Sequence, residues 1–159
     1  MNPIGELLAP GDIVLDVDVS TKGELLKKVA RMLAGRHGLS ETQVLESLIA
    51  REQLGSTALG HGVAIPHARM AQCDAATGVF VRTRIAVPFD APDGKPVSMF
   101  LGLVVPKQAT QRHLQLLATA AGIFSDANLR GKLRTATDAG TVTALLAAWP
   151  DSPPSPGGD

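Results

Sequence analysis

The segment 51–69 carries the residue types best suited to chemistry on a phosphate group. His67 follows Pro66, whose ring fixes the backbone dihedral φ, so the imidazole should extend from a stiff backbone. Arg51 and Arg69 add guanidinium groups at the two ends of the segment. A rigidly held histidine close to positive charge suits a site that accepts a phosphate group.

The first part of this segment is rich in small residues that let a ligand come close to the backbone. Gly55 has no side chain to shield its N–H group, and Ser56 and Thr57 add hydroxyl donors. We therefore predict a loop in which residues 55–57 bind phosphate oxygens, largely through backbone N–H groups, while Arg51 supplies positive charge. Two more glycines in the loop also permit positive φ: Gly60 and Gly62.

His67 is the leading candidate for the reacting residue. Neutral imidazole is nucleophilic near pH 7, and one ring nitrogen can attack while a hydrogen bond holds the other. A phosphoryl group on a ring nitrogen forms a high-energy bond, so it can be passed to another acceptor. Phosphoryl transfer has a loose transition state, so the protein chiefly supplies positioning and positive charge. The residues alone leave open a structural histidine that bonds to a buried carbonyl group.

His113 is the second candidate. With Thr110 as N-cap, His113 becomes the third residue of a helix, where the helix dipole favours a neutral ring or a nearby anion. A second imidazole there could bind phosphoryl oxygens or orient the first ring. A half-exposed histidine at a helix start explains the local sequence equally well.

The remaining histidines and the single cysteine give weak signals. His61 lies six residues before His67, but this spacing without a third ligand nearby is a poor zinc signal. His37 is most simply a capping residue at the end of a helix. Cys73, the only cysteine, cannot form an internal disulfide. We predict neither a metal nor another cofactor.

Length and charge limit the class of protein. The 159 residues include 15 basic and 15 acidic ones, which argues against a general binder of nucleic acid or membrane surfaces. Residues 1–150 fit one domain, and the Pro/Gly-rich tail 151–159 is predicted to be disordered. No apolar run approaches the ~20 residues that span a bilayer, and no signal peptide is recognisable. We expect a cytoplasmic protein.

Hydrophobic periodicity and capping residues predict the secondary structure. The predicted elements, in chain order, are a strand over 13–19, helices after Thr21 and Ser40, strands over 77–87 and 97–105, and helices after Thr110, Ser125 and Thr137. Counting three or so strands in the middle of the chain, the order β-α-α-β-β-β-α-α-α implies a three-layer α/β/α sandwich around a small mixed sheet. In the helix after Thr110, the spacing predicts an inner face of Leu114, Leu117, Ala118 and Ala121.

Three segments, in this order, resemble the type-2 enzyme IIA domains of the bacterial phosphoenolpyruvate-dependent phosphotransferase system, the fructose/mannitol group. The most specific is Arg51-Glu-x-Leu-Gly-Ser-Thr-x-Leu-Gly-x-Gly-Val-Ala-Ile-Pro-His67. The others are Val87-Pro-Phe-Asp-Ala-Pro-Asp-Gly-Lys-Pro-Val97 and the pair His113-Leu114. The resemblance covers residues 4–148 and is greatest to the nitrogen-related regulatory branch.

This resemblance implies a role for each candidate residue. His67 matches the residue that accepts a phosphoryl group from the histidine-containing phosphocarrier protein. His113 matches the second active-site histidine, and Arg51 matches the arginine that steadies the phosphate. In the nitrogen branch the phosphorylation state is itself the output, read by regulatory partners such as kinases and potassium transporters, and it would signal nitrogen, carbon or potassium status.

Two other interpretations stay open. The chain could serve a fructose- or mannitol-type sugar permease and pass the phosphoryl group to a IIB domain. It could also be a contact-only regulatory binding module that has lost phosphotransfer. His61 stands where nitrogen-branch members commonly have a small polar residue, so the resemblance implies no role for it.

Overall fold

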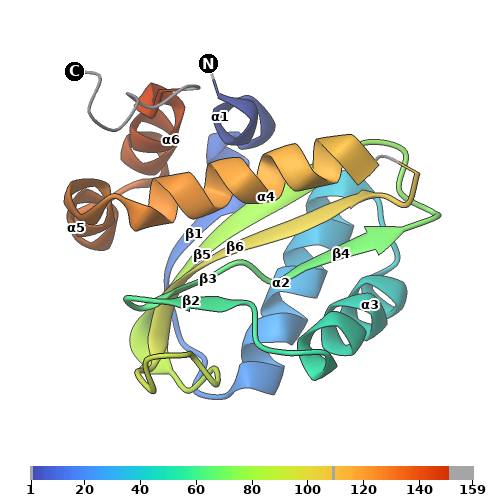
Figure 1. Ribbon diagram of the computed structural model, residues 1–159, viewed down its shortest axis with the longest axis horizontal. Helices are drawn as coiled ribbons and strands as arrows, with labels where there is room; N and C mark the ends of the chain where they lie inside the picture. Colours follow the sequence, from blue (N-terminus) through green and yellow to red (C-terminus); the bar gives the residue numbers. More distant parts are fainter. Residues whose placement is uncertain (1, 109, 151–159) are drawn as a thin grey trace.

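A six-stranded mixed sheet forms the middle layer of the computed structural model, which describes residues 2–108 and 110–150 (Figure 1). Helices α2 and α3 cover one face of the sheet, and α1, α4, α5 and α6 cover the other. The predicted α/β/α sandwich is therefore confirmed. The predicted disorder of residues 151–159 lies outside the described residues.

The elements follow the chain as α1 (Pro3–Leu7), the 3-10 helix η1 (Pro10–Asp12), β1 (Ile13–Val17), α2 (Lys22–His37), α3 (Glu41–Gln53), β2 (Ala58–Gly60), β3 (Val63–Ala64), β4 (His67–Met70), β5 (Thr77–Val87), β6 (Val97–Pro106), α4 (Thr110–Ser125), α5 (Ala127–Thr135) and α6 (Ala139–Ala148). Both halves of the predicted capping box are present at α2, where Thr21 and Glu24 bond to each other's backbone N–H groups. No described helix is long and apolar enough to cross a membrane.

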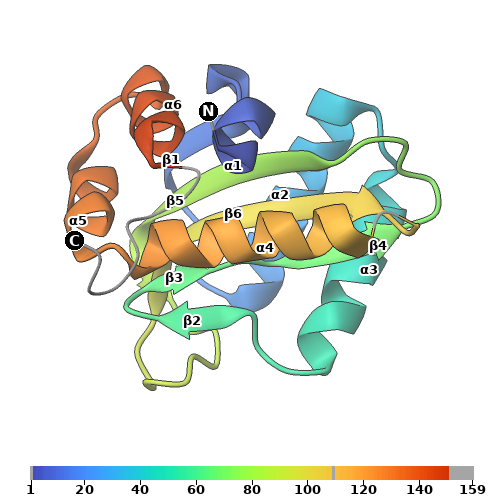
Figure 2. The same ribbon diagram turned by 45° about the horizontal axis from the view of Figure 1, so that its top comes forward.

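The strands follow the order β1-β5-β6-β3-β2, with β4 also paired to β6 (Figure 2). The long strands β5 and β6 are antiparallel and nearly all of β6 is buried, as its unbroken apolar run predicts. Strands β3 and β4 run parallel to β6, and β4 places His67 beside Leu103. The segment that carries His67 is therefore part of the sheet.

This placement corrects the prediction of a continuous glycine-rich loop. Three short strands, β2, β3 and β4, occupy most of residues 58–70. Left-handed backbone at Gly60, His61 and Gly62, with φ of 90°, 56° and 77°, makes the turn between β2 and β3. Strands of two to four residues are too short to show an alternating pattern, so only pairing with β6 reveals them.

The predicted inner face of α4 is wrong at Leu114 and Ala118, whereas Leu117 is partly buried and packs against the core as predicted. Leu114 is 61% exposed and Ala118 is exposed as well. The buried residues of this helix are Leu116, Ala120, Ile123 and Phe124. Because α4 carries apolar residues on two neighbouring stripes, their spacing could not decide which stripe meets the sheet. Thr110 is the first helical residue rather than the cap, so His113 is the fourth residue and still lies in the first turn.

Candidate functional site

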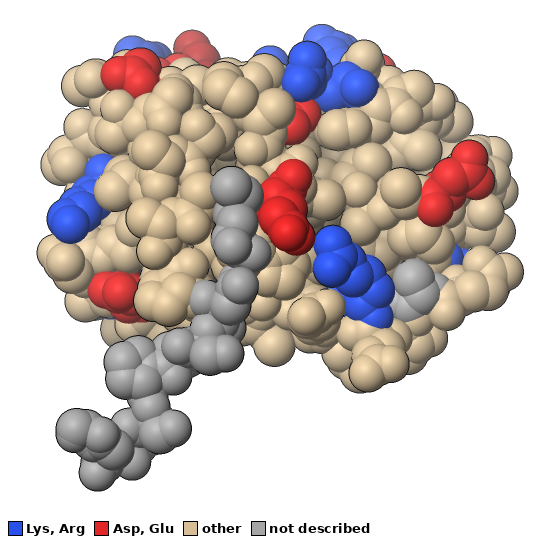
Figure 3. Space-filling model, turned by 90° about the horizontal axis from the view of Figure 1, so that it is seen from above, with Lys and Arg blue, Asp and Glu red and all other residues tan. Residues whose placement is uncertain are grey.

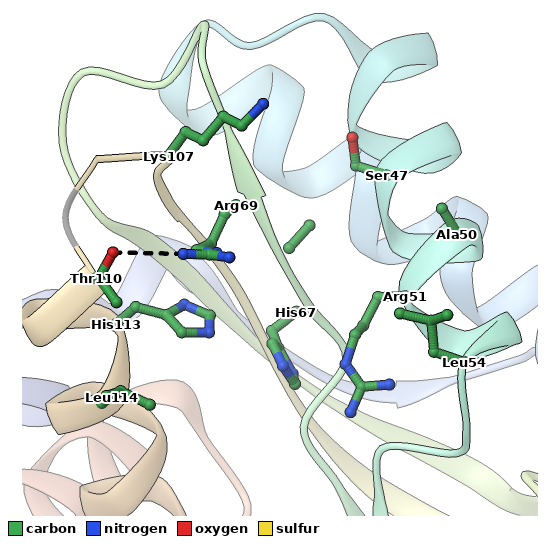
Figure 4. A pocket seen from close by; sticks show the side chains of 11 residues that line it. Ser47, Ala50, Arg51, Leu54, His67, Arg69, Lys107, Thr110, His113 and Leu114 are labelled. Atoms are coloured by element: carbon green, nitrogen blue, oxygen red, sulfur yellow. Dashed lines mark hydrogen bonds between the residues drawn. The ribbon is translucent and has the colours of Figure 1, made fainter.

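A pocket of about 580 Å³ opens where α3, β4 and the start of α4 meet (Figure 4). His67 extends into it from β4, His113 faces it from α4, and the guanidinium of Arg51 reaches toward His67 from the end of α3. The two imidazole rings have centroids 5.4 Å apart and are tilted by 51°. Three residues predicted from distant parts of the chain thus meet in one place.

A local hydrogen bond fixes the protonation of the His67 ring. Its Nδ1 atom lies 2.7 Å from the carbonyl oxygen of Ile65. A carbonyl oxygen only accepts hydrogen bonds, so Nδ1 carries the hydrogen and Nε2 keeps its lone pair when the ring is neutral. Pro66 joins the two residues between β3 and β4 and stiffens the link. His67 does bond to a carbonyl, as the structural alternative expected, but its second nitrogen is left for chemistry.

Both rings are neutral at pH 7, because burial lowers their pKa values from the ordinary value of about 6.5. For His67, the hydrogen bond to Ile65 acts against burial, and the charge of Arg51 lowers the pKa further. For His113, the neighbouring His67 and Arg69 add to the effect of burial. A neutral ring is the form of histidine that can act as a nucleophile.

The pocket is positively charged. Arg51, Arg69 and Lys107 line it, and none of its described lining residues is Asp or Glu. Nη1 of Arg51 donates to the carbonyl oxygen of Gly55 at 2.8 Å, and Nη1 of Arg69 donates to the Thr110 hydroxyl at 3.4 Å. On the face seen in Figure 3, by contrast, charged side chains are scattered among neutral ones. Such a pocket favours an anionic group.

Two of the three residues predicted to bind phosphate border a hollow other than the pocket that contains His113. Ser56 and Thr57 border a second hollow of about 230 Å³ that also touches Arg51 and His67. The Ser56 hydroxyl donates to the carbonyl oxygen of Phe89 at 2.6 Å and accepts from the N–H of Ala58 at 3.1 Å. These contacts hold the backbone around Ser56 in place.

The N–H groups of Gly55 and Thr57 are also used within the protein. Gly55 donates to the backbone oxygen of Glu52 at 3.1 Å, and the N–H and hydroxyl of Thr57 donate to the Glu52 carboxylate. Phosphate binding by residues 55–57 therefore stays a prediction, and the contacts assign Gly55 and Thr57 a part in shaping the loop.

Glu52 is a supporting residue that the sequence did not reveal. Its side chain is 4% exposed and lies 3.1 Å from Nζ of Lys22. A glutamate late in an amphipathic helix normally faces solvent, and its burial here depends on α2 and on Thr57.

Lys107 is a pocket residue that the sequence also did not reveal, since a lysine after a strand looks like an ordinary turn residue. Its nearness to Arg69 follows from the pairing of β4 with β6.

The other two histidines lie apart from this pocket. His61 borders a different pocket, and Nε2 of His37 contacts the Asp12 carboxylate at 3.1 Å. The helix ends at His37 as predicted, but the predicted capping role is wrong, because Gly38 is the left-handed C-cap and the His37 side chain contacts Asp12. Within residues 2–108 and 110–150, no group of three His, Cys, Asp or Glu residues could hold a metal ion.

Comparisons with known proteins agree with this fold over nearly its whole length. Residues 6–149 match the family described as "Phosphoenolpyruvate-dependent sugar phosphotransferase system, EIIA 2". A nitrogen regulatory protein of Bradyrhizobium diazoefficiens is 36% identical over 148 residues, which cover 93% of this chain and 97% of that protein. One from Pseudomonas aeruginosa is 37% identical over 142 residues, covering 89% and 92%. The crystal structure of nitrogen regulatory protein IIA-Ntr from Neisseria meningitidis is 50% identical, with a TM-score of 0.86, and the match covers 90% of this chain and 98% of that chain.

Proposed function

Because the chain belongs to the type-2 EIIA family of the phosphoenolpyruvate-dependent sugar phosphotransferase system, whose members are phosphocarrier proteins, we propose that it accepts a phosphoryl group on Nε2 of His67. The observation that carries this proposal is the hydrogen bond from His67 Nδ1 to Ile65. It directs the lone pair of the neutral ring to the other nitrogen, in a pocket with three cationic side chains and no described acidic lining.

The reaction exchanges one phosphorus–nitrogen bond for another. The lone pair of Nε2 attacks the phosphorus of a phosphohistidine on the donor protein, and the donor's phosphorus–nitrogen bond breaks. The electron pair of that bond stays on the donor's ring nitrogen. Arg51 and Arg69 stabilise the charge on the transferred oxygens, since positioning and electrostatics provide most of the catalysis in phosphoryl transfer. An N–H group of His113 binds a phosphoryl oxygen.

The rim of the pocket suits a protein donor. Leu54 is 85% exposed and Leu114 is 61% exposed, and both line the pocket beside Ala50. Exposed apolar side chains around a charged centre are typical of a docking surface. We assign this rim to the histidine-containing phosphocarrier protein, which must bring its phosphohistidine within reach of His67.

Phosphorylation changes the charge that a regulatory partner meets. The pocket carries three positive charges from Arg51, Arg69 and Lys107. A phosphoryl group adds about −1.5 to −2 charges at pH 7 and so cancels about half or more of this positive charge. Partners such as kinases or potassium transporters could distinguish the two states by this change. The names of the relatives at 36–37% identity support a nitrogen-regulatory output over a sugar-permease role.

Intact-mass spectrometry tests the proposal. The wild type, His67→Ala and the control His61→Ala would each be incubated with phosphoenolpyruvate, enzyme I and the phosphocarrier protein. The wild type and His61→Ala should gain one phosphate that is lost in mild acid, and His67→Ala should gain none. A phosphorylated His67→Ala protein would contradict the site. If the phosphocarrier protein becomes phosphorylated but the wild type gains no phosphate, the contact-only module would be favoured. Transfer onward to a IIB protein would favour the sugar-permease role.

A further inference from the structure

A second cationic pocket lies at the opposite end of the sheet from His67. It has a volume of about 410 Å³ and is bordered by the turn between β2 and β3, the start of β6 and helix α5 (Figure 1). Lys95, Arg130 and Arg134 line it beside His61, and none of its described lining residues is Asp or Glu. It shares no lining residue with the pocket that contains His67.

The turn between β2 and β3 holds one of these arginines in place. Nη2 of Arg134 donates to the carbonyl oxygen of His61. His61 has φ of 56°, a left-handed conformation that is uncommon for residues other than glycine, and its N–H donates to the Asp93 carboxylate at 3.0 Å. A Cβ atom on Gly62 would lie 3.0 Å from Nη2 of Arg134, so the glycine leaves room for the guanidinium. The turn and the arginine thus fit each other closely.

The second arginine is buried with an unused donor. Arg130 is 8% exposed, and its Nη1 donates to the carbonyl oxygen of Phe124 at 2.7 Å. Its Nε is buried and has no hydrogen-bond partner among the described residues. Buried polar groups in proteins nearly always have a partner, so an N–H without one calls for an acceptor. The nearby Asp93 carboxylate bonds to the backbone N–H groups of His61 and Lys95 instead.

We propose that this second pocket binds a small anion bearing a phosphate group. Two arginines and a lysine without a lining carboxylate match the charge of phosphate, and a guanidinium can bind two of its oxygens at once. The volume is within the range of small-molecule sites and is larger than a single phosphate group needs. The phosphate group binds Arg130, Arg134 and Lys95, and the rest of an ester contacts Pro96. This binding does not depend on phosphorylation of His67.

An NMR titration of the full-length 15N-labelled protein tests this site. Inorganic phosphate and glucose 6-phosphate would be added separately at constant ionic strength, with the amide signals of His61, Gly62 and Ser98 as reporters. Arg134→Gln and Lys95→Gln should each weaken binding by about tenfold or more, because each removes a charged hydrogen-bond donor. Lys132→Gln is the matched control, since it removes one charge from α5 without touching the pocket.

Saturable shifts at the three reporters, weakened in Arg134→Gln and Lys95→Gln but not in Lys132→Gln, are the expected result. Tighter binding of glucose 6-phosphate would identify a phosphorylated metabolite as the source of the anion, and equal or tighter binding of inorganic phosphate would identify the free ion. Three results would overturn the proposal: no saturation with either anion, equal weakening in all three variants, or shifts confined to residues around His67.

Discussion

Replacing Glu52 by alanine should strongly destabilise the protein, although Glu52 makes no contact with a reacting group. Its buried carboxylate accepts from the Thr57 N–H at 3.2 Å, accepts from the Thr57 hydroxyl and lies 3.1 Å from Nζ of Lys22. Removing one partner of a buried pair costs about 3–5 kcal/mol. Lys22 is 25% exposed and lies 3.4 Å from Asp90, so its charge can be solvated again. We therefore expect a loss of about 3 kcal/mol.

Urea unfolding followed by circular dichroism measures this loss as a lower midpoint at an unchanged slope. Glu52→Gln keeps an oxygen for the Thr57 N–H but loses the charge, so we expect it to lose about half as much free energy of unfolding. Glu46→Ala is the matched control, because Glu46 lies on the same helix and is exposed, and it should change stability by about 0.5 kcal/mol or less. Equal losses in Glu52→Ala and Glu46→Ala would refute the assigned role of Glu52.

Three further predictions concern the site and the packing of the sheet. Because burial holds the pKa values of His67 and His113 below the ordinary value of about 6.5, each ring is more than half neutral at that pH, so the rate of phosphoryl acceptance should fall to half its maximum only below pH 6.5. An NMR titration that finds His67 half-protonated above pH 6.5 would contradict this. His113→Gln should slow phosphoryl acceptance by about 10²-fold in a single-turnover assay with no change in circular dichroism, and an unchanged rate would remove His113 from the mechanism. Gly102→Ala would place a Cβ atom 2.6 Å from Cγ1 of Val29 and should cost about 1–3 kcal/mol in urea unfolding, whereas Gly35→Ala, in open space on α2, should stabilise by about 0.5–1 kcal/mol. An unchanged free energy of unfolding in Gly102→Ala would show that the sheet can shift to make room for the added methyl group.

The sequence predicted best what depends on neighbouring residues. The start of α2 follows from the capping box at Thr21, and its buried stripe follows from a 3.6-residue period. The long strands β5 and β6 follow from their β-branched and apolar runs. The residues around His67 and His113 made each of them a candidate but did not predict that the two side chains lie close together. Their convergence was expected from the resemblance, and it depends on β4 pairing with β6 and on the position of α4.

What the sequence could not predict depends on contacts between distant segments. The rotation of α4, which turns Leu114 outward and His113 toward His67, is decided by how the helix packs on the sheet. The burial of Glu52 requires Lys22 from another helix. The cationic pocket around Arg134 joins three segments that have no shared motif. Each of these depends on tertiary packing, which a local pattern does not encode.

The hydrogen bond to Ile65 should make Nε2 the nitrogen of His67 that accepts the phosphoryl group. Nitrogen–phosphorus NMR of the 15N-labelled phosphoprotein tests it directly, because the coupling to phosphorus identifies the bonded ring nitrogen. We predict a phosphoryl group on Nε2 of His67, with Nδ1 still protonated and bonded to Ile65. A phosphoryl group on Nδ1, or on any other histidine, would contradict the claim.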